Sequence, residues 1–171
     1  MNAKTHSIHC SPQVFLENHV DFDHFEVVHG NYSDPKLIHC SYQNNQYTAV
    51  YSLCYGRLLK RTIVYHYTVT RISETRWQAT IDTKDLGINY RVSYEAEAIA
   101  DKETTIRIDV RASAPLLPNI ACHGFSMMAK RLTTREFYRD KSVIEGPTNR
   151  FPKPHLEPSD TAIKIFRTFA K

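Results

Sequence analysis

The middle of the chain alternates apolar and polar residues over long stretches, and β-branched and aromatic side chains fill many of the apolar positions. Alternation of this kind is typical of strands that bury one face. No helical pattern separates these stretches from one another, so the six or seven strands should pair antiparallel in series. The predicted strands are residues 5–10, 37–43, 47–55, 61–72, 76–82, 89–99 and 104–112.

Turn residues lie between several of the predicted strands. Asn44 and Asn45 separate two alternating segments, which predicts a two-residue hairpin. Asp101 and Lys102 occupy the same place between the last two strands. Residues 31–35 run through Asn, Ser, Asp and Pro, and we expect a turn there as well.

Helical signals flank the strand-rich region. Ser11 followed by Pro12 suits an N-cap and a first helical position, and this predicts a helix from Pro12 to His29 that stops at Gly30. The spacing turns helical again over residues 120–144.

The C-terminal region is predicted to hold a further helix. Residues 114–118 break the strand pattern before the long helix, and residues 149–158 are extended and rich in proline. Ser159 and Asp160 can cap a last helix whose apolar residues recur up to Phe169.

The order helix, antiparallel meander, long helix predicts an α+β fold of the helix-grip type, similar to START and SRPBCC domains. In that fold a curved sheet of six to seven strands packs on a long C-terminal helix. The 171 residues are expected to form one such domain, residues 1–171. A cavity between sheet and helix usually takes an apolar or aromatic ligand.

Composition narrows the class of protein. The net charge is +4 and hydrophobic residues make up 42% of the chain. The charges form no basic stripe, so nucleic acid is not an expected partner. The N-terminus has no apolar signal region and no segment is long and apolar enough to span a membrane. We therefore expect a soluble, cytoplasmic protein.

The four cysteines are too sparse for a disulfide framework; they lie at positions 10, 40, 54 and 122. None belongs to a C-x-x-C, C-x-H or C-x-x-H pattern. This excludes the common zinc and Rieske cluster spacings within the chain.

The segment 17–30 carries the candidate chemistry, because it holds three histidines and four acids in fourteen residues. Two imidazoles and one carboxylate form the facial triad that suits Fe(II) and leaves positions open for O₂. His24 and His29 are five residues apart, about 140° around a straight helix. Both can face one metal only if the helix ends or bends between them. Asp21, three residues before His24, could orient an imidazole.

The spacing Asn18-x2-Asp21-x2-His24-x4-His29, with Gly30 after it, resembles the mononuclear-iron motif of Rieske-type ring-hydroxylating oxygenases. The resemblance implies that His24 and His29 bind iron. It also implies that Asp21 bridges to the Rieske cluster of a neighbouring subunit and that Asn18 lies close to the iron.

The third iron ligand of this family is an aspartate on the long C-terminal helix. Residues 136–145 are similar to that segment and place Asp140 at the matching position, with Glu136 one turn earlier as the alternative. The stretch 150–167 also resembles the tail of such enzymes. The likeness covers about residues 10–30 and 133–170.

The resemblance implies an oxygenase catalytic domain or subunit. With mononuclear Fe(II) and O₂ it would hydroxylate or demethylate a hydrophobic aromatic or polycyclic substrate. The family also carries a Rieske [2Fe–2S] domain, and we expect this chain to lack it. A separate Rieske or ferredoxin-type donor could supply electrons, the chain could be a truncated catalytic domain, or the domain could be reused without this chemistry.

The family likeness also implies a homotrimer, although that arrangement depends on the Rieske domain. Two alternatives remain open from the residues. The chain could be a non-catalytic helix-grip protein that binds an apolar ligand in its cavity, or a subunit whose metal is structural.

Overall fold

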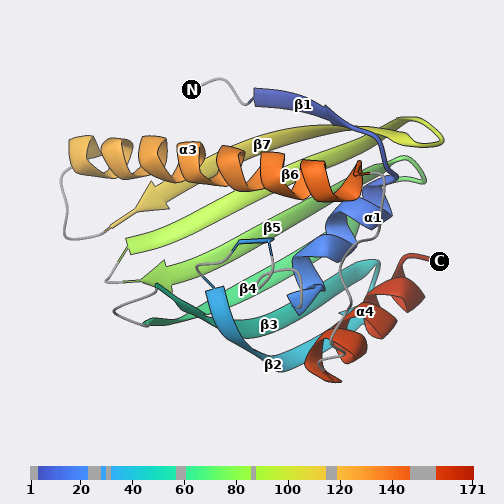
Figure 1. Cartoon of the computed structure of the whole chain (residues 1–171), viewed down its shortest axis with the longest axis horizontal. Helices are drawn as coiled ribbons and strands as arrows, with labels where there is room; N and C mark the ends of the chain where they lie inside the picture. The colour runs from blue at the N-terminus through green and yellow to red at the C-terminus, as the bar shows by residue number, and fades with distance from the viewer. Residues whose placement is uncertain are drawn as a thin grey trace.

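The computed structural model describes residues 4–22, 28–29, 32–56, 61–85, 88–114, 119–146 and 157–171. Figure 1 shows a curved sheet with helices laid across one of its faces. The sheet has seven strands in the order β1-β7-β6-β5-β4-β3-β2, and each neighbouring pair is antiparallel. The strands are β1 (Lys4–Ile8), β2 (Tyr32–Gln43), β3 (Gln46–Tyr55), β4 (Arg61–Arg71), β5 (Arg76–Asp85), β6 (Ile88–Ala100) and β7 (Glu103–Ser113).

The predicted antiparallel meander is confirmed, and its tightest turn is the β2–β3 hairpin. Gln43 pairs with Gln46, so the loop contains only Asn44 and Asn45. Their φ angles are 49° and 63°. Two successive residues with positive φ are typical of a type I′ turn, which asparagine tolerates better than most side chains.

The predicted turn at residues 31–35 is wrong, because β2 already begins at Tyr32. Asp34 has a φ of 53°, and the pairing with β3 shifts between Ser33 and Lys36. The polar, proline-containing segment therefore forms an irregularity inside an edge strand. Pro35 is tolerated there because an edge strand leaves some backbone N–H positions without a strand partner.

The first helix is shorter than predicted. Ser11 caps α1 (Pro12–Glu17) by accepting a hydrogen bond from the Val14 backbone N–H, as expected. A 3₁₀ turn, η1 (Asn18–Val20), follows α1, and Asp21 is then extended with a ψ of 91°. The helix cannot continue through Asp21 with this backbone, so the prediction of one helix from Pro12 to His29 is wrong.

Buried side chains continue past the end of α1. His19, Val20 and Phe22 are all buried, and the Phe22 ring lies 5.0 Å from that of Tyr51. These three residues follow Phe15 and Leu16 at spacings of three, four and seven residues, which place side chains on one helix face, so burial toward the sheet continues after the regular helix has ended.

Two further helices complete the layer over the sheet, namely α3 (Asn119–Ile144) and α4 (Glu157–Phe169). The long helix α3 packs on β7, α4 packs on β2 and β3, and α1 lies between them against β5 and β6. This arrangement confirms the predicted helix-grip fold. No helix in the described ranges is long and apolar enough to cross a membrane.

Aromatic side chains fill much of the core between helices and sheet. Tyr47 and Tyr67 are both buried, and each donates its hydroxyl to a helix carbonyl, that of Ala162 at 3.3 Å and that of Leu16 at 2.9 Å. The Phe166 ring of α4 meets Tyr47 edge to face at 5.2 Å. These contacts hold α1 and α4 against the sheet. They do not fill the space beside α3.

Candidate metal centre and cavity

A cavity of about 170 Å³ lies between the concave face of the sheet and the helices. Its wall combines three tyrosines, four aliphatic residues and two threonines with a cluster of two histidines and two acids. The wall residues are Tyr51, Tyr65, Tyr94, Leu53, Ile81, Val92, Leu132, Thr83 and Thr133, and the cluster is His19, His29, Glu136 and Asp140.

Strand alternation places the wall residues on one face. Tyr51 pairs with Tyr65 across β3 and β4, and their rings stack at 5.4 Å. Ile81 pairs with Val92 across β5 and β6 in the same way. Because side chains two positions apart point to the same face of a sheet, four neighbouring strands present one continuous apolar and aromatic surface to the cavity.

His29 and Asp140 meet at the edge of this cavity. The Nε2 atom of His29 lies 3.0 Å from Oδ1 of Asp140, and the two side chains are only 4% and 11% exposed. The structure thus brings together two of the three residues predicted to bind iron. His24, the third, lies outside the described residues.

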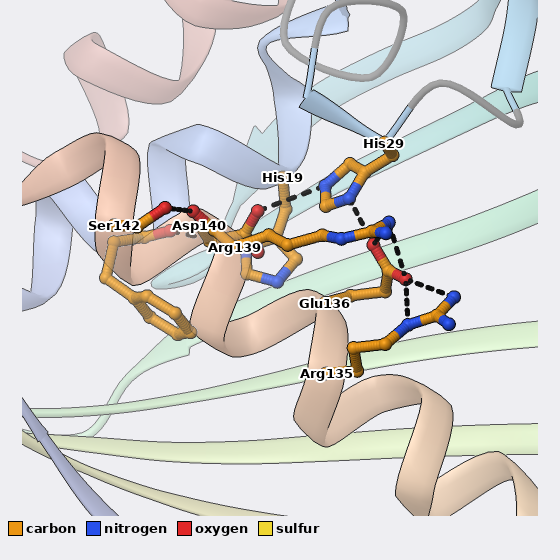
Figure 2. A network of polar contacts seen from close by, with 8 residues as sticks. His19, His29, Arg135, Glu136, Arg139, Asp140 and Ser142 are labelled. Atoms are coloured by element: carbon orange, nitrogen blue, oxygen red, sulfur yellow. Dashed lines mark hydrogen bonds and ion pairs between the residues drawn. The ribbon is translucent and has the colours of Figure 1, made fainter.

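Glu136 holds the other side of the His29 ring. Its Oε2 atom lies 2.5 Å from His29 Nδ1, and Figure 2 shows the imidazole between the two acids of α3. Arg139 contacts both carboxylate oxygens of Glu136 at 3.2 and 3.1 Å. Arg135 donates to Oε1 through Nε and Nη2. The two acids are one helical turn apart, which places both on the face of α3 that meets His29.

The two acids control the charge of His29. Burial by itself lowers the pKa of His29, but the hydrogen bonds and negative charges of Asp140 and Glu136 outweigh burial and raise the pKa above its ordinary value. Both ring nitrogens face carboxylate oxygens, so both can donate only when the imidazole is protonated. A cation beside Nε2 would replace one of these protons.

The donor atoms of His29 and Asp140 are spaced as two neighbouring ligands of one first-row metal ion would be. Ligand atoms at about 2.1 Å from a metal and about 90° apart are about 3.0 Å from each other. The Nε2 to Oδ1 distance matches this separation. Among the described residues no group of three His, Cys, Asp or Glu side chains is placed to hold one metal ion, and His24 is not among them.

Asn18 and Asp21 lie in and just after η1. Among the described residues that line the cavity, neither of the two is present. Asp21 lies close enough to Arg167 of α4 to contribute to the raised pKa of that guanidinium, mainly set by Glu17. The predicted relation of Asp21 to His24 involves a residue outside the described ranges.

Sequence reasoning assigned no role to His19, which lines the cavity and is 7% exposed. Its Nδ1 atom lies 3.3 Å from the Phe15 carbonyl oxygen, and its ring stacks on Tyr67 at 5.4 Å. The sequence pattern likewise assigned no role to the tyrosines of the wall. Their alternation within strands was the available signal, but it does not say which face of the sheet is concave.

Solved structures with this fold include dicamba monooxygenase bound to 3,6-dichlorosalicylic acid. That structure has a TM-score of 0.66 and 10% identity, over 98% of this chain and 57% of that one. NdmB of Pseudomonas putida CBB5 has a TM-score of 0.63 and 14% identity, over 99% of this chain and 48% of that one. The chain thus spans about half the length of these two proteins.

A similar fold also occurs in the lipid transfer and protein localization domain of human StarD13. It has a TM-score of 0.57 and 12% identity, over 83% of this chain and 75% of that one. At such low identities these likenesses establish the fold alone. No curated protein matches the chain.

The family comparison is more specific than the fold. Residues 1–151 match the sequence model of the 3-ketosteroid 9alpha-hydroxylase C-terminal domain. The match includes α1, strands β1 to β7, and Glu136 and Asp140 on α3. It supports the resemblance to the catalytic domains of Rieske-type oxygenases. The chain therefore belongs to the 3-ketosteroid 9alpha-hydroxylase C-terminal domain family.

Proposed function

We propose that this chain is the catalytic domain or subunit of a non-haem iron oxygenase, with Fe(II) held by His24, His29 and Asp140. The observation that carries the proposal is the buried His29–Asp140 pair, whose 3.0 Å separation suits neighbouring ligands of one metal. The pair opens onto an apolar cavity, where a substrate can lie beside the metal.

Bound Fe(II) would supply the activation of O₂, which no protein side chain provides. The chain's own residues do the rest. The apolar wall excludes water and positions the substrate against the His29–Asp140 edge. Asp21 is proposed to mark the surface where electrons arrive, and Asn18 to lie close to the metal.

The substrate we propose is a hydrophobic compound with an aromatic or polycyclic ring system. The family description names a ketosteroid, and dicamba monooxygenase holds a single-ring salicylate. The described cavity is close in size to an engineered cavity of about 150 Å³ that binds benzene. The described residues therefore enclose about one ring, and the remainder of a larger substrate would extend toward the cavity mouth.

Electrons are proposed to come from a partner that carries a Rieske or ferredoxin-type cluster. The cysteine spacing offers no such cluster in this chain. The partner is proposed as a separate protein, and a homotrimer is the assembly that the family likeness suggests.

Anaerobic loading with Fe(II) followed by elemental analysis tests the proposal. Wild-type protein is expected to hold about one iron per chain, the number of sites in a facial triad. His24→Ala and Asp140→Asn are each expected to lose it. His123→Ala is the matched control, because His123 is an exposed histidine on α3. Absence of iron from the wild type, or iron retained by both site variants, would refute the proposal.

A second function is favoured by one observation, the shared fold with the lipid transfer domain of StarD13. In this alternative the cavity binds an apolar ligand without iron chemistry. Equilibrium binding of an apolar ring compound to protein that holds no iron even after Fe(II) loading would support the alternative. If ligand affinity instead depends on bound Fe(II), the oxygenase function is favoured.

A further inference from the structure

Glu136 lines the cavity but is not one of the three residues proposed to hold the iron. It lies on α3 one turn before Asp140, and its carboxylate contacts the nitrogen of His29 that faces away from Asp140. We infer that Glu136 is a positioning residue that fixes the His29 ring, so that Nδ1 carries the proton and Nε2 is presented to the metal. This inference rests on the proposed function.

The two nitrogens of imidazole differ in what they can do toward a metal. A neutral ring carries its proton on one nitrogen, and only the other nitrogen has a lone pair available for a metal. A carboxylate 2.5 Å from Nδ1 favours the proton on that atom. Asp140 also offers a carboxylate to Nε2, but a metal held by Asp140 would displace the proton from that nitrogen and take its lone pair, while Nδ1 keeps its proton beside Glu136. The contact therefore selects the tautomer and holds the ring plane at the same time.

The arginines explain why Glu136 assists and Asp140 binds. Arg139 donates to both oxygens of Glu136, and Arg135 donates twice to Oε1. Figure 2 shows this carboxylate enclosed between the two guanidinium groups and the imidazole. Four arginine hydrogen bonds hold this carboxylate in place and offset its charge. A carboxylate bound in this way is a poor metal ligand but a rigid support for a ring.

The two acids also differ in solvent exposure, and this difference agrees with their separate roles. The side chain of Asp140 is 11% exposed and that of Glu136 is 23% exposed. Glu136 thus lies at the rim, where the partly exposed arginines reach it, and Asp140 lies deeper beside Nε2. Two acids spaced by one helical turn thus contact the two ring nitrogens of one imidazole.

The test compares Glu136→Ala and Glu136→Gln with wild type. Glu145→Gln is the matched control, since Glu145 lies just beyond α3, is 22% exposed and forms its own ion pair with Lys141. Two readouts are used. The first is the nitrogen-15 NMR spectrum of His29 in metal-free protein at alkaline pH, where the imidazole is neutral and the spectrum reports which ring nitrogen bears the one proton. The second is the dissociation constant for Co(II), a redox-stable probe of the same ligands.

Glu136→Ala is expected to lose the deshielded Nδ1 proton and to weaken Co(II) binding by roughly 10- to 100-fold, as for other supports of metal-bound histidines. Glu136→Gln keeps an acceptor oxygen, so it should fall between Glu136→Ala and wild type. Glu145→Gln should match wild type in both measurements. This graded order is not expected from a merely structural ion pair.

Other outcomes overturn the inference. If Glu136→Ala lowers the unfolding midpoint but leaves the Co(II) dissociation constant at the wild-type value, the network is structural only. If wild-type His29 carries its proton on Nε2 alone, Glu136 does not select the tautomer. Failure of the proposed function is distinguishable, because wild-type protein would then bind neither Fe(II) nor Co(II) while the NMR measurement still decides the role of Glu136.

Discussion

His29 and Asp140 approach within 3.0 Å through Nε2 and Oδ1, although the whole strand meander separates them along the chain. The contact forms only after the sheet has folded and α3 has packed across it. Formation of the candidate metal centre is thus coupled to completion of the fold. Variants that perturb the wall, the core or the tightest turn should therefore differ in how far they affect the metal centre.

Narrowing the cavity should block the ligand without removing the metal. Val92 of β6 lines the cavity, and Val92→Phe places a larger side chain in that space. We expect the affinity for a naphthol probe to fall by at least about tenfold, because the added side-chain volume takes up space that the ligand needs. The fluorescence of the probe measures its binding. Iron content should be unchanged, since Val92 supplies no ligand.

The control for Val92→Phe is Val64→Phe. Val64 lies on β4, and its side chain is 38% exposed. The same change in size there should leave naphthol affinity at the wild-type value. Equal loss of affinity in both variants would contradict the assignment of the cavity as the ligand site.

The last helix should be part of the folded unit. Phe166 is fully buried and packs against Tyr47 and Phe169. Phe166→Ala is expected to lower the free energy of unfolding by about 3–5 kcal/mol, through lost burial and the cavity left behind. Chemical denaturation followed by circular dichroism measures the change. Val14→Ala on the exposed side of α1 should change it by no more than about 0.5 kcal/mol.

The β2–β3 turn should reject β-branched residues. Asn45 has a φ of 63°, and its side-chain amide donates to the Arg71 carbonyl at 3.0 Å. Asn45→Val is expected to destabilise the fold by about 1–2 kcal/mol from the left-handed backbone, with some further loss from the missing hydrogen bond. Asn45→Gly also loses the hydrogen bond, but glycine adopts a positive φ without strain. The thermal midpoint of this variant should therefore lie closer to that of the wild type. A Val variant as stable as the Gly variant would contradict the turn assignment.

In the folded protein the thiol of Cys10 should be alkylated slowly even at pH values where an exposed cysteine reacts readily. Burial raises the pKa of its thiol from 9.0 to about 11. The thiolate is the species that is alkylated, so at pH 8 the native rate with iodoacetamide should be about 100-fold below that of the unfolded chain, or slower where access also limits it. The native rate should keep rising with pH toward 11, and the unfolded rate should level off near 9.

Mass spectrometry of the alkylated peptide follows this reaction in native and denatured protein.

The raised pKa of Cys10 also has a consequence for the stability of the fold. The folded state holds the thiol proton more tightly than the unfolded chain, so the contribution of Cys10 to stability is complete below pH 9 and is lost as the pH rises through 11. Equal alkylation rates in the two states at pH 8 would contradict the buried position of Cys10.

Local signals in the sequence were enough to predict most of the fold. Alternation identified each strand of the meander, and the pair Asn44-Asn45 located the hairpin because few other residues adopt positive φ. Ser11 and Pro12 located the start of α1 for a similar reason. Each of these features depends on residues within a few positions of one another.

The predictions that failed depend on distant contacts. No glycine or proline stands between Glu17 and His29, and His19, Val20 and Phe22 keep the apolar spacing of a helix, so the residue pattern carries no signal for the helix end at Glu17. Likewise, Asp34 enters β2 as an irregularity because β3 is available to pair with the residues around it. Local propensity ranks conformations, and long-range packing then selects among them.

The candidate site divides along the same line. The histidine spacing, the acid pair on the long helix and their likeness to an oxygenase motif can be read from residue order, because chemistry requires particular side chains. Which nitrogen of His29 faces Asp140, and that Glu136 with its two arginines takes the other, depends on how α3 lies across a curved sheet. Those directions arise from the packing of elements far apart in the chain, for which local periodicity carries no information.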